Sequence, residues 1–361
     1  MSSTIEGNPT PPAGVADAGT SELKTALARR PGEHRVLTGD RPTGPLHLGH
    51  YFGTLQNRVR LQDLGVDVLV LIADYQTITD RDSPASLPGD VEALLADYLA
   101  VGLDPRRATI FAHSMVPALH QLMLPLLSLV SVAELSRNPT VKDEVAAAGI
   151  DAMSALMFAY PVHQAADILC CRATIVPVGA DQLPHVELTR SLARRFNRRY
   201  CDRCAPLFAL PEPLLGEAPA LLGTDGRKMS KSRGNAISIG ASADETARLI
   251  AGARTDSQRL ITYDPGDRPE VSNLVALAAL CLDRSPHEIA EQVGDAGSAA
   301  LKRLATDAVN ERFAPVRARR AELIEDHAYL REVLRAGSSR VRALGDETLT
   351  LVHERMHASY L

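Results

Sequence analysis

Tryptophan is absent from this chain of 361 residues, and lysine is scarce. Lysine stands only at positions 24, 142, 228, 231 and 302, although lysine and arginine together number 39. No apolar run is long enough to cross a bilayer, and the N-terminus lacks the charged-then-apolar pattern of a signal peptide. These absences predict a protein without membrane association and with a cytoplasmic location.

The five cysteines are an odd number, which argues against a disulfide framework. Cys201 and Cys204 have the spacing of half a zinc site. No second Cys-x-x-Cys and no paired histidine follows at the spacing of a zinc finger. We therefore predict plain thiols and no metal held by the protein itself.

The composition is that of an ordinary globular protein, with 45% hydrophobic and 23% charged residues. The net charge of -5 means that a nucleic-acid partner must meet a local basic face rather than a global field. A basic cluster near one expected helix consists of Arg312, Arg317, Arg319 and Arg320. Contact with tRNA phosphates and an ordinary solvated face both remain open for this cluster.

The chain divides into three parts. Residues 1–33 are rich in small and polar side chains and predict a flexible tail, within which a short surface helix over 21–30 is compatible with the pattern. Residues 239–361 are helical in pattern without a credible strand. Between them, the pattern alternates strands with helices: strands over 34–37, 67–73, 108–112 and 173–178, and helices over 48–64, 91–102, 119–135, 152–171 and 183–200. The proline-rich segment 206–220 is expected only to connect.

This alternation predicts an α/β fold, with a Rossmann-like, doubly wound parallel sheet over residues 34–238 and an all-helical domain after it. Ligands of such sheets bind at the carboxyl ends of the strands. Two polar segments, 74–77 (DYQT) and 179–182 (GADQ), directly follow expected strands. We expect both to line a ligand site.

The stretch 38–51 contains the turn from the first expected strand to the first expected helix, and two glycines and two prolines lie between these two elements. Unpaired N–H groups and a partial positive charge at a helix N-terminus suit phosphate. His47 and His50 are three positions apart on that helix, so both can donate to phosphate oxygens. The spacing is neither the dinucleotide glycine fingerprint nor a P-loop.

Glycines flank the cationic segment 223–235, which predicts a mobile loop. Two of the five lysines, Lys228 and Lys231, lie in it. A solvated charge run does not explain lysine in a chain that otherwise uses arginine. Lysine is a compact point charge that can follow a moving phosphate.

Tyr160, Gln164 and Asp167 share one face of an otherwise apolar helix. A carboxylate there needs a partner, because burying it alone is costly. It either serves a ligand or is a structural acid paired with Arg172 or a helix end. Both interpretations remain open at this point.

Residues 47–50 (HLGH) and 228–232 (KMSKS) together resemble the two signatures of class I aminoacyl-tRNA synthetases. Within this class, the chain is similar to the bacterial tryptophanyl-tRNA synthetases from about residue 34 to the C-terminus. Further matching segments are 39–51, Tyr160-Pro161, 165–169 (AADIL), 176–179 (VPVG), Asp181-Gln182, 187–190 (ELTR), 195–197 (RFN) and 255–257 (TDS).

The resemblance implies that Asp167 accepts the indole N–H, while Tyr160 and Gln182 hold the α-amino group. The implied tryptophan-binding residues are Gly39, Gln76, Tyr160, Gln164, Asp167 and Gln182. The implied ATP-binding residues are Arg41, Pro42, Thr43, Gly49, His50, Gly179, Ala180, Asp181, Leu221, Lys228, Met229, Ser230, Lys231 and Ser232. The implied catalytic residues are His47, His50, Lys228 and Lys231.

The resemblance also implies that the helical domain 239–361 binds a tRNA anticodon. The expected partners are L-tryptophan, tRNA(Trp) and a second copy of the chain in a homodimer. The expected cofactors are ATP and a Mg²⁺ ion bound with it rather than in a protein cage. The expected reaction is activation of tryptophan by ATP, followed by its transfer to tRNA(Trp).

Three positions depart from the family. Arg41, Gln76 and Gln164 stand where glutamine, histidine and methionine are often found. Gln164-x-x-Asp167 is similar to tyrosyl-tRNA synthetases, so tyrosine activation is an alternative. A small-molecule adenylyltransferase and an auxiliary or regulatory paralogue are two further alternatives.

Overall fold

The computed structural model describes residues 23–79, 86–137, 153–179, 182–216 and 221–360. Its centre is a sheet of five parallel strands in the order β3-β2-β1-β4-β5. The strands are β1 (Arg35–Asp40), β2 (Asp67–Ile72), β3 (Ala108–Ala112), β4 (Ile175–Val178) and β5 (Glu212–Leu215). Strand order reverses between β1 and β4, which confirms the predicted doubly wound arrangement.

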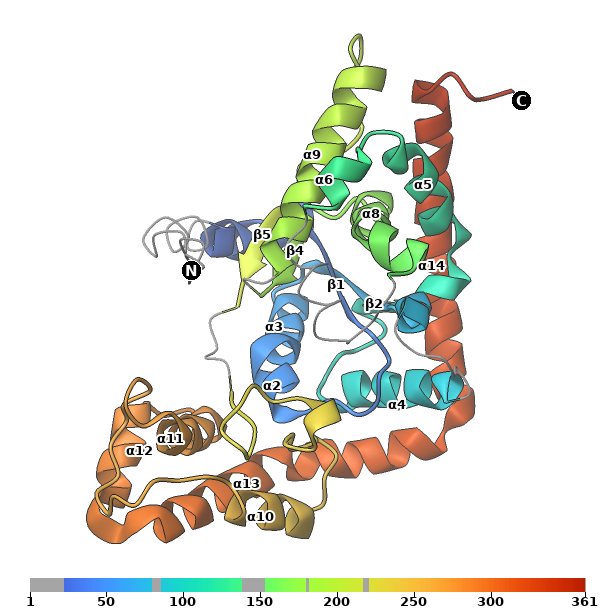
Figure 1. Cartoon of the computed structure of the whole chain (residues 1–361). Helices are drawn as coiled ribbons and strands as arrows, with labels where there is room; N and C mark the ends of the chain where they lie inside the picture. Colours follow the sequence, from blue (N-terminus) through green and yellow to red (C-terminus); the bar gives the residue numbers. More distant parts are fainter. Residues whose placement is uncertain (1–22, 80–85, 138–152, 180–181, 217–220, 361) are drawn as a thin grey trace, which may run out of the picture.

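Helices cover both faces of this sheet (Figure 1). The first follows β1 as α2 (Leu48–His50), a π-helical turn (Tyr51–Leu55) and α3 (Gln56–Asp63). The others in this part are α4 (Leu87–Ala100), α5 (Pro117–Leu127), α6 (Val132–Leu135), α8 (Ala155–Cys170) and α9 (Leu183–Tyr200). Short 3-10 turns follow two strands at their carboxyl ends, η3 (Asp74–Thr79) after β2 and η4 (His113–Met115) after β3.

Two predictions for this part were wrong. The segment expected only to connect contains β5, which pairs in parallel with β4. Pro213 lies in this edge strand, where a missing backbone N–H is tolerated. The strand was not predicted because proline is rare in strands. The single helix expected over 119–135 ends at Leu127, soon after Pro125, and α6 begins anew behind the capping hydroxyl of Ser131.

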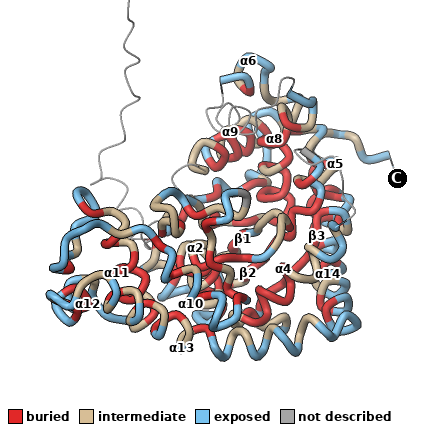
Figure 2. Tube along the Cα trace, turned by 60° about the horizontal axis from the view of Figure 1, so that its bottom comes forward, coloured by how far each residue is buried: buried red, intermediate tan, exposed pale blue. Residues whose placement is uncertain are grey.

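Buried residues run along the sheet and the helices around it, whereas the outer turns of α13 (Gly297–Glu325) face solvent (Figure 2). The predicted N-terminal tail is packed from residue 23 onward. Residues 23–29 form the expected short helix, but Leu23 and Leu27 are buried in the main core. Of the predicted tail, residues 1–22 lie outside the described residues, whereas residues 23–33 belong to the described fold.

After residue 239, the described chain is helical, as predicted. Its helices are α10 (Ala243–Ala251), α11 (Pro269–Leu282), α12 (Pro286–Val293), α13 (Gly297–Glu325) and α14 (His327–Arg355). Helix α14 returns to the α/β part and lies against β3 and α5 (Figure 1). It approaches so closely that a Cβ atom at Gly337 would overlap the carbonyl oxygen of Ile110. The last helix is thus part of the packing around the sheet.

Candidate active site

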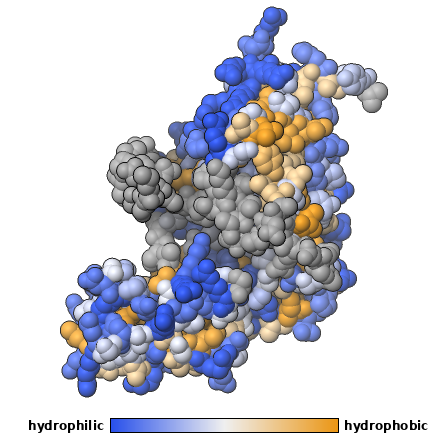
Figure 3. Space-filling model, viewed as in Figure 1, coloured by the Kyte–Doolittle hydropathy of each residue, from blue (hydrophilic) through white to orange (hydrophobic). Residues whose placement is uncertain are grey.

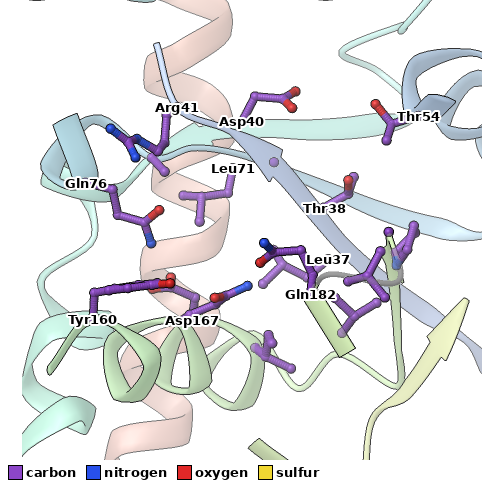
Figure 4. Close-up of a pocket in the computed structure, with 18 of the residues that line it drawn as sticks. Leu37, Thr38, Asp40, Arg41, Thr54, Leu71, Gln76, Tyr160, Asp167 and Gln182 are labelled. Atoms are coloured by element: carbon purple, nitrogen blue, oxygen red, sulfur yellow. The ribbon is translucent and has the colours of Figure 1, made fainter. Parts of the chain in front are cut away.

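A cavity of about 310 Å³ opens at the carboxyl ends of β1, β2 and β4. In Figure 4, Tyr160 and Asp167 rise from α8 toward Gln76 and Arg41, which follow β2 and β1. The cavity is lined by all six residues expected to bind tryptophan: Gly39, Gln76, Tyr160, Gln164, Asp167 and Gln182. The helical spacing of Tyr160, Gln164 and Asp167 therefore does place them on one face of α8.

Asp167 is buried, with 1% of its surface exposed. Its Oδ1 atom lies 2.7 Å from Nε2 of His113, a residue outside the predicted set of site residues. Arg172, the structural partner that was considered, instead contacts Thr348 and Glu347. The Oδ2 atom of Asp167 is buried and accepts no hydrogen bond from any described residue. Oδ1 has the close contact with His113 but no aligned hydrogen bond either, so the carboxylate keeps acceptor capacity for a donor on a ligand in the cavity that Asp167 lines.

His113 follows β3 at the same edge of the sheet as the predicted polar segments. Ligand sites of such sheets lie at the carboxyl ends of strands, so the position of His113 directly after the expected strand 108–112 is a signal of the same kind as the two predicted polar segments. Burial works to lower the pKa of His113, but the charge of Asp167 and the contact with it prevail and raise that pKa. The pair therefore has the character of an ion pair within the fold.

His113, His163 and Asp167 are the one group of three potential metal ligands among the described residues. The rings of His113 and His163 are stacked, 4.6 Å apart and at 22°. Nitrogens of stacked rings do not converge on one point, as the ligands of a tetrahedral ion must. His163 Nε2 instead lies 2.8 Å from Nδ1 of His120, so these side chains form a chain of polar contacts.

The predicted phosphate-binding turn lies between β1 and α2, beside the cavity. His47 N donates to Nδ1 of His50 at 3.2 Å, so the neutral His50 ring carries its proton on Nε2. Burial and neighbouring charges lower the pKa of His47 to about 3 and that of His50 to about 4. Both rings are therefore neutral at neutral pH and still offer N–H donors. The His47 ring and the Met229 sulfur pack over Gly49, where a side chain would meet them.

A buried ion pair supports the end of β1 beneath the cavity. The Arg58 guanidinium, with a side chain 2% exposed, lies 2.6 Å from Oδ2 of Asp40. Tyr98 donates to the same oxygen at 2.7 Å. Burial works to raise the pKa of Asp40, but Arg58 outweighs it and holds that pKa at about 2. Asp40 is therefore ionised throughout the physiological range and fixes the backbone beside Arg41.

The lysine loop 223–235 is folded around Asn235, whose side chain is almost fully buried. Its Oδ1 accepts from Ser230 N at 2.8 Å, and its Nδ2 donates to Asp225 at 2.7 Å. Lys231 Nζ donates to the carbonyl oxygen of Gly44 in the phosphate turn at 2.6 Å. Lys228 is exposed. The two predicted motifs therefore lie against each other.

Five further residues of the expected ATP set divide into three groups. Arg41 and Gly179 line the same cavity as the amino-acid residues. Leu221 is buried in the main hydrophobic core and does not line it. Ala180 and Asp181 lie outside the described residues.

The basic cluster is used within the fold rather than forming a free cationic face. Arg320 Nε lies 2.5 Å from Oδ1 of the fully buried Asp97, and Arg312 pairs with Asp283 at 2.8 Å. Arg317 donates to Asn310 and Thr246. Among the four arginines, Arg319 alone has no ion pair or hydrogen bond with a described residue. The cluster does not support phosphate contact as a unit.

Comparison with known proteins agrees with this geometry. Residues 30–314 match the family model of the tRNA synthetases class I (W and Y). The chain belongs to this family. Since the match spans the sheet, both motifs and the start of the helical part, the class I fold extends over most of this synthetase.

Two curated relatives are tryptophan–tRNA ligases. The protein of Treponema pallidum is 42% identical over 334 residues, which cover 90% of this synthetase and 97% of the relative. That of Streptococcus pyogenes serotype M1 is 39% identical over 337 residues, covering 90% and 98%. The synthetase therefore spans nearly the full length of both relatives.

Solved structures show the same architecture. The tryptophanyl-tRNA synthetase of Campylobacter jejuni, complexed with ADP and tryptophan, superposes with a TM-score of 0.78 at 32% identity. It is matched over 90% of this synthetase and 99% of that chain. A tyrosyl-tRNA synthetase of Archaeoglobus fulgidus, at 23% identity and a TM-score of 0.62, shares the fold. Membership of the synthetase family argues against the small-molecule adenylyltransferase alternative.

Proposed function

We propose that this synthetase is a tryptophan–tRNA ligase, which activates L-tryptophan with ATP and then transfers it to tRNA(Trp). One observation carries the proposal: buried Asp167 lines a cavity that Tyr160 and Gln182 also line, and neither of its carboxylate oxygens accepts an aligned hydrogen bond from a described residue. An indole N–H is a donor without an acceptor function, so a carboxylate suits it. The relatives named as tryptophan–tRNA ligases support the same substrate.

In the first step, the tryptophan carboxylate attacks the α-phosphorus of ATP, and pyrophosphate leaves. The enzyme aligns the two reactants and stabilises the charge on the phosphates. Neutral His47 and His50 donate N–H groups, while Lys228 and Lys231 supply positive charge from the loop. The α-amino group of tryptophan binds Tyr160 and Gln182. In the second step, a ribose hydroxyl of the terminal adenosine of the tRNA attacks the carbonyl carbon of tryptophanyl-adenylate, so that an ester forms and AMP leaves.

Mg²⁺ fits this site only as a companion of ATP. Oxygen ligands suit it, and it commonly binds through substrate phosphates. The one group of three potential metal ligands in the described chain, at His113, lies at the amino-acid end and contains two imidazoles. When bound with ATP, the ion neutralises phosphate charge. The chain's own contribution there is the two histidines and the two lysines.

Partners and location complete the proposal. The helical region after residue 239 is proposed to bind the tRNA anticodon. A homodimer is supported by an apolar surface over α5 and α6, where Leu124 is 73% and Val132 is 71% exposed (Figure 3). No described helix combines the length and the apolar character that crossing a membrane requires. A cytoplasmic location corresponds to a role in translation.

ATP–pyrophosphate exchange, measured with each amino acid in turn, tests the function. Exchange should depend on tryptophan, and charging of tRNA(Trp) should follow. Tyrosine is a second candidate because Gln164 and Asp167 both line the cavity. Tyrosine-dependent exchange with no response to tryptophan would favour it. Absence of exchange with any amino acid would favour a regulatory paralogue.

A further inference from the structure

His113 and Asp167 meet beneath the amino-acid end of the cavity, with side chains that are 0% and 2% exposed. We propose that His113 is a positioning residue for the amino-acid substrate: it holds one oxygen of Asp167 and thereby presents the other to the substrate's N–H. The inference rests on the proposed function and assigns a role to a residue that does not itself line the cavity.

A proton on His113 lies between the two side chains. A carboxylate oxygen can only accept, so Nε2 of His113 must carry the hydrogen in the 2.7 Å contact with Oδ1. This contact fixes the rotation of the carboxyl group. Asp167 lines the cavity, and its Oδ2 atom accepts nothing from the described residues; Oδ1 has the close contact with His113, in which the N–H is not aligned as in a regular hydrogen bond. The arrangement offers one acceptor of defined direction to a ligand.

His113 is itself held in place by neighbouring turns and helices. It begins the turn η4 directly after β3, and that turn is fastened to the turn η3 after β2. The Asp74 carboxylate accepts from the backbone N–H of Ser114 at 3.0 Å and from the Ser114 hydroxyl. His120 Nε2 donates to the carbonyl oxygen of His113 at 3.1 Å. The His113 backbone is thus held from two neighbouring elements.

The charge state of His113 depends on the titratable groups that surround it. The titratable groups around His113 are Asp167 and His163 on α8, His120 on α5 and Asp74 on η3. Burial lowers the pKa of both His120 and His163, so these rings remain neutral and do not compete for the carboxylate. The positive charge of His113 then faces two carboxyl groups, with Asp167 in direct contact and Asp74 contributing at longer range.

In a variant without His113, the Asp167 carboxyl group would be buried without the charged partner that it now contacts. Burial alone raises the pKa of a carboxyl group. A protonated Asp167 is a poorer acceptor for an indole N–H. Tryptophan affinity should then weaken as the pH falls, over a range in which the unaltered protein stays constant.

The experiment compares His113→Leu with His113→Gln, whose amide keeps an N–H donor near the carboxylate. Thr348→Val is the matched control, because buried Thr348 bonds Cys170 O at the end of the same helix α8 but does not line the cavity. Tryptophan KM and ATP KM are measured by pyrophosphate exchange at about pH 6, about pH 7 and about pH 8.5.

We expect His113→Leu to raise the tryptophan KM by roughly tenfold or more at neutral pH, the scale of losing a charge-assisted contact, and further at about pH 6. The ATP KM should stay within about twofold, and His113→Gln should recover most of the loss. Thr348→Val should keep the wild-type tryptophan KM at each pH, whatever its stability.

A tryptophan KM in His113→Leu that equals the wild-type value at every pH would overturn the inference. Equal loss in His113→Leu and Thr348→Val would do the same, since it would mark a general effect on folding. If His113→Leu does not fold, His113→Asn replaces it, because its shorter amide cannot reach Asp167. Failure of the proposed function differs from these results: the wild-type protein would itself lack tryptophan-dependent exchange.

Discussion

Lys231 Nζ donates a 2.6 Å hydrogen bond to the carbonyl oxygen of Gly44. This bond joins the lysine loop to the phosphate turn, two segments that are 187 positions apart in the chain. Burial lowers the pKa of His47 and of His50, and the charge of this ammonium group lowers it further. A positive charge is therefore already held where the proposed phosphates would bind.

Replacing either loop lysine should slow adenylate formation. We expect Lys231→Ala and Lys228→Ala to reduce the exchange rate by about 10² to 10³, the scale of removing one preorganised donor. Tryptophan affinity should change little, because the loop acts on phosphate. Lys302→Ala is the control, since Lys302 also donates to a backbone carbonyl, at 2.9 Å, but in the helical region. Wild-type exchange in both loop variants would contradict the assigned role.

Asp167→Asn should weaken tryptophan binding by about 1.5 to 3 kcal/mol, the value of a hydrogen bond to a charged group. The unfolding free energy should also fall by about 1 to 3 kcal/mol, because His113 loses its partner. The chain has no tryptophan of its own, so indole fluorescence of the ligand can be followed directly. Asp256→Asn breaks a carboxylate–arginine pair with Arg268 in another region and should leave tryptophan affinity unchanged. Equal tryptophan affinity in wild type and Asp167→Asn would remove Asp167 from the pocket.

Arg320→Met should destabilise the fold by about 2 to 4 kcal/mol, because it leaves the buried Asp97 without its cation. Asp97 Oδ2 also accepts from Leu46 N at 2.9 Å, so the loss should extend to the phosphate turn. Denaturant unfolding measures the effect. Arg319→Met, at the exposed neighbouring position, is expected to stay within about 0.5 kcal/mol of wild type. Similar losses in the two variants would show that the Arg320–Asp97 pair contributes nothing specific.

His47 should make the fold sensitive to acid. Its pKa is lowered to about 3 in the folded protein, whereas a histidine in the unfolded chain has a pKa of about 6.5. Below about pH 6.5, the unfolded chain therefore binds a proton at His47 that the folded chain does not bind, so the stability falls with falling pH. Between about pH 7.5 and about pH 5, wild type should lose roughly 1 to 2 kcal/mol more than His47→Gln.

Urea unfolding at the two pH values measures this difference. His353→Gln, on an exposed position of α14, serves as the control and should lose as much as wild type. Parallel losses in wild type and His47→Gln would mean that the buried imidazole is not kept neutral by the fold.

Much of the architecture could be predicted from local patterns. Continuous apolar runs such as residues 67–72 are typical of buried parallel strands, and β2 lies there. Helical spacing placed Tyr160, Gln164 and Asp167 on one face, and all three line the cavity. β5 was missed because its proline and its exposed first residue break the apolar pattern that the central strands keep.

The sequence by itself determined the doubly wound sheet, the helical C-terminal part and the family, because these depend on periodicity and on contiguous motifs. Only the tertiary structure decided the partners of charged side chains. The partner of Asp167 is His113, 54 positions away, and that of Arg320 is Asp97, 223 positions away. Local pattern carries no information about such pairs, because they form only when packing brings distant strands and helices together and burial makes an unpaired charge costly.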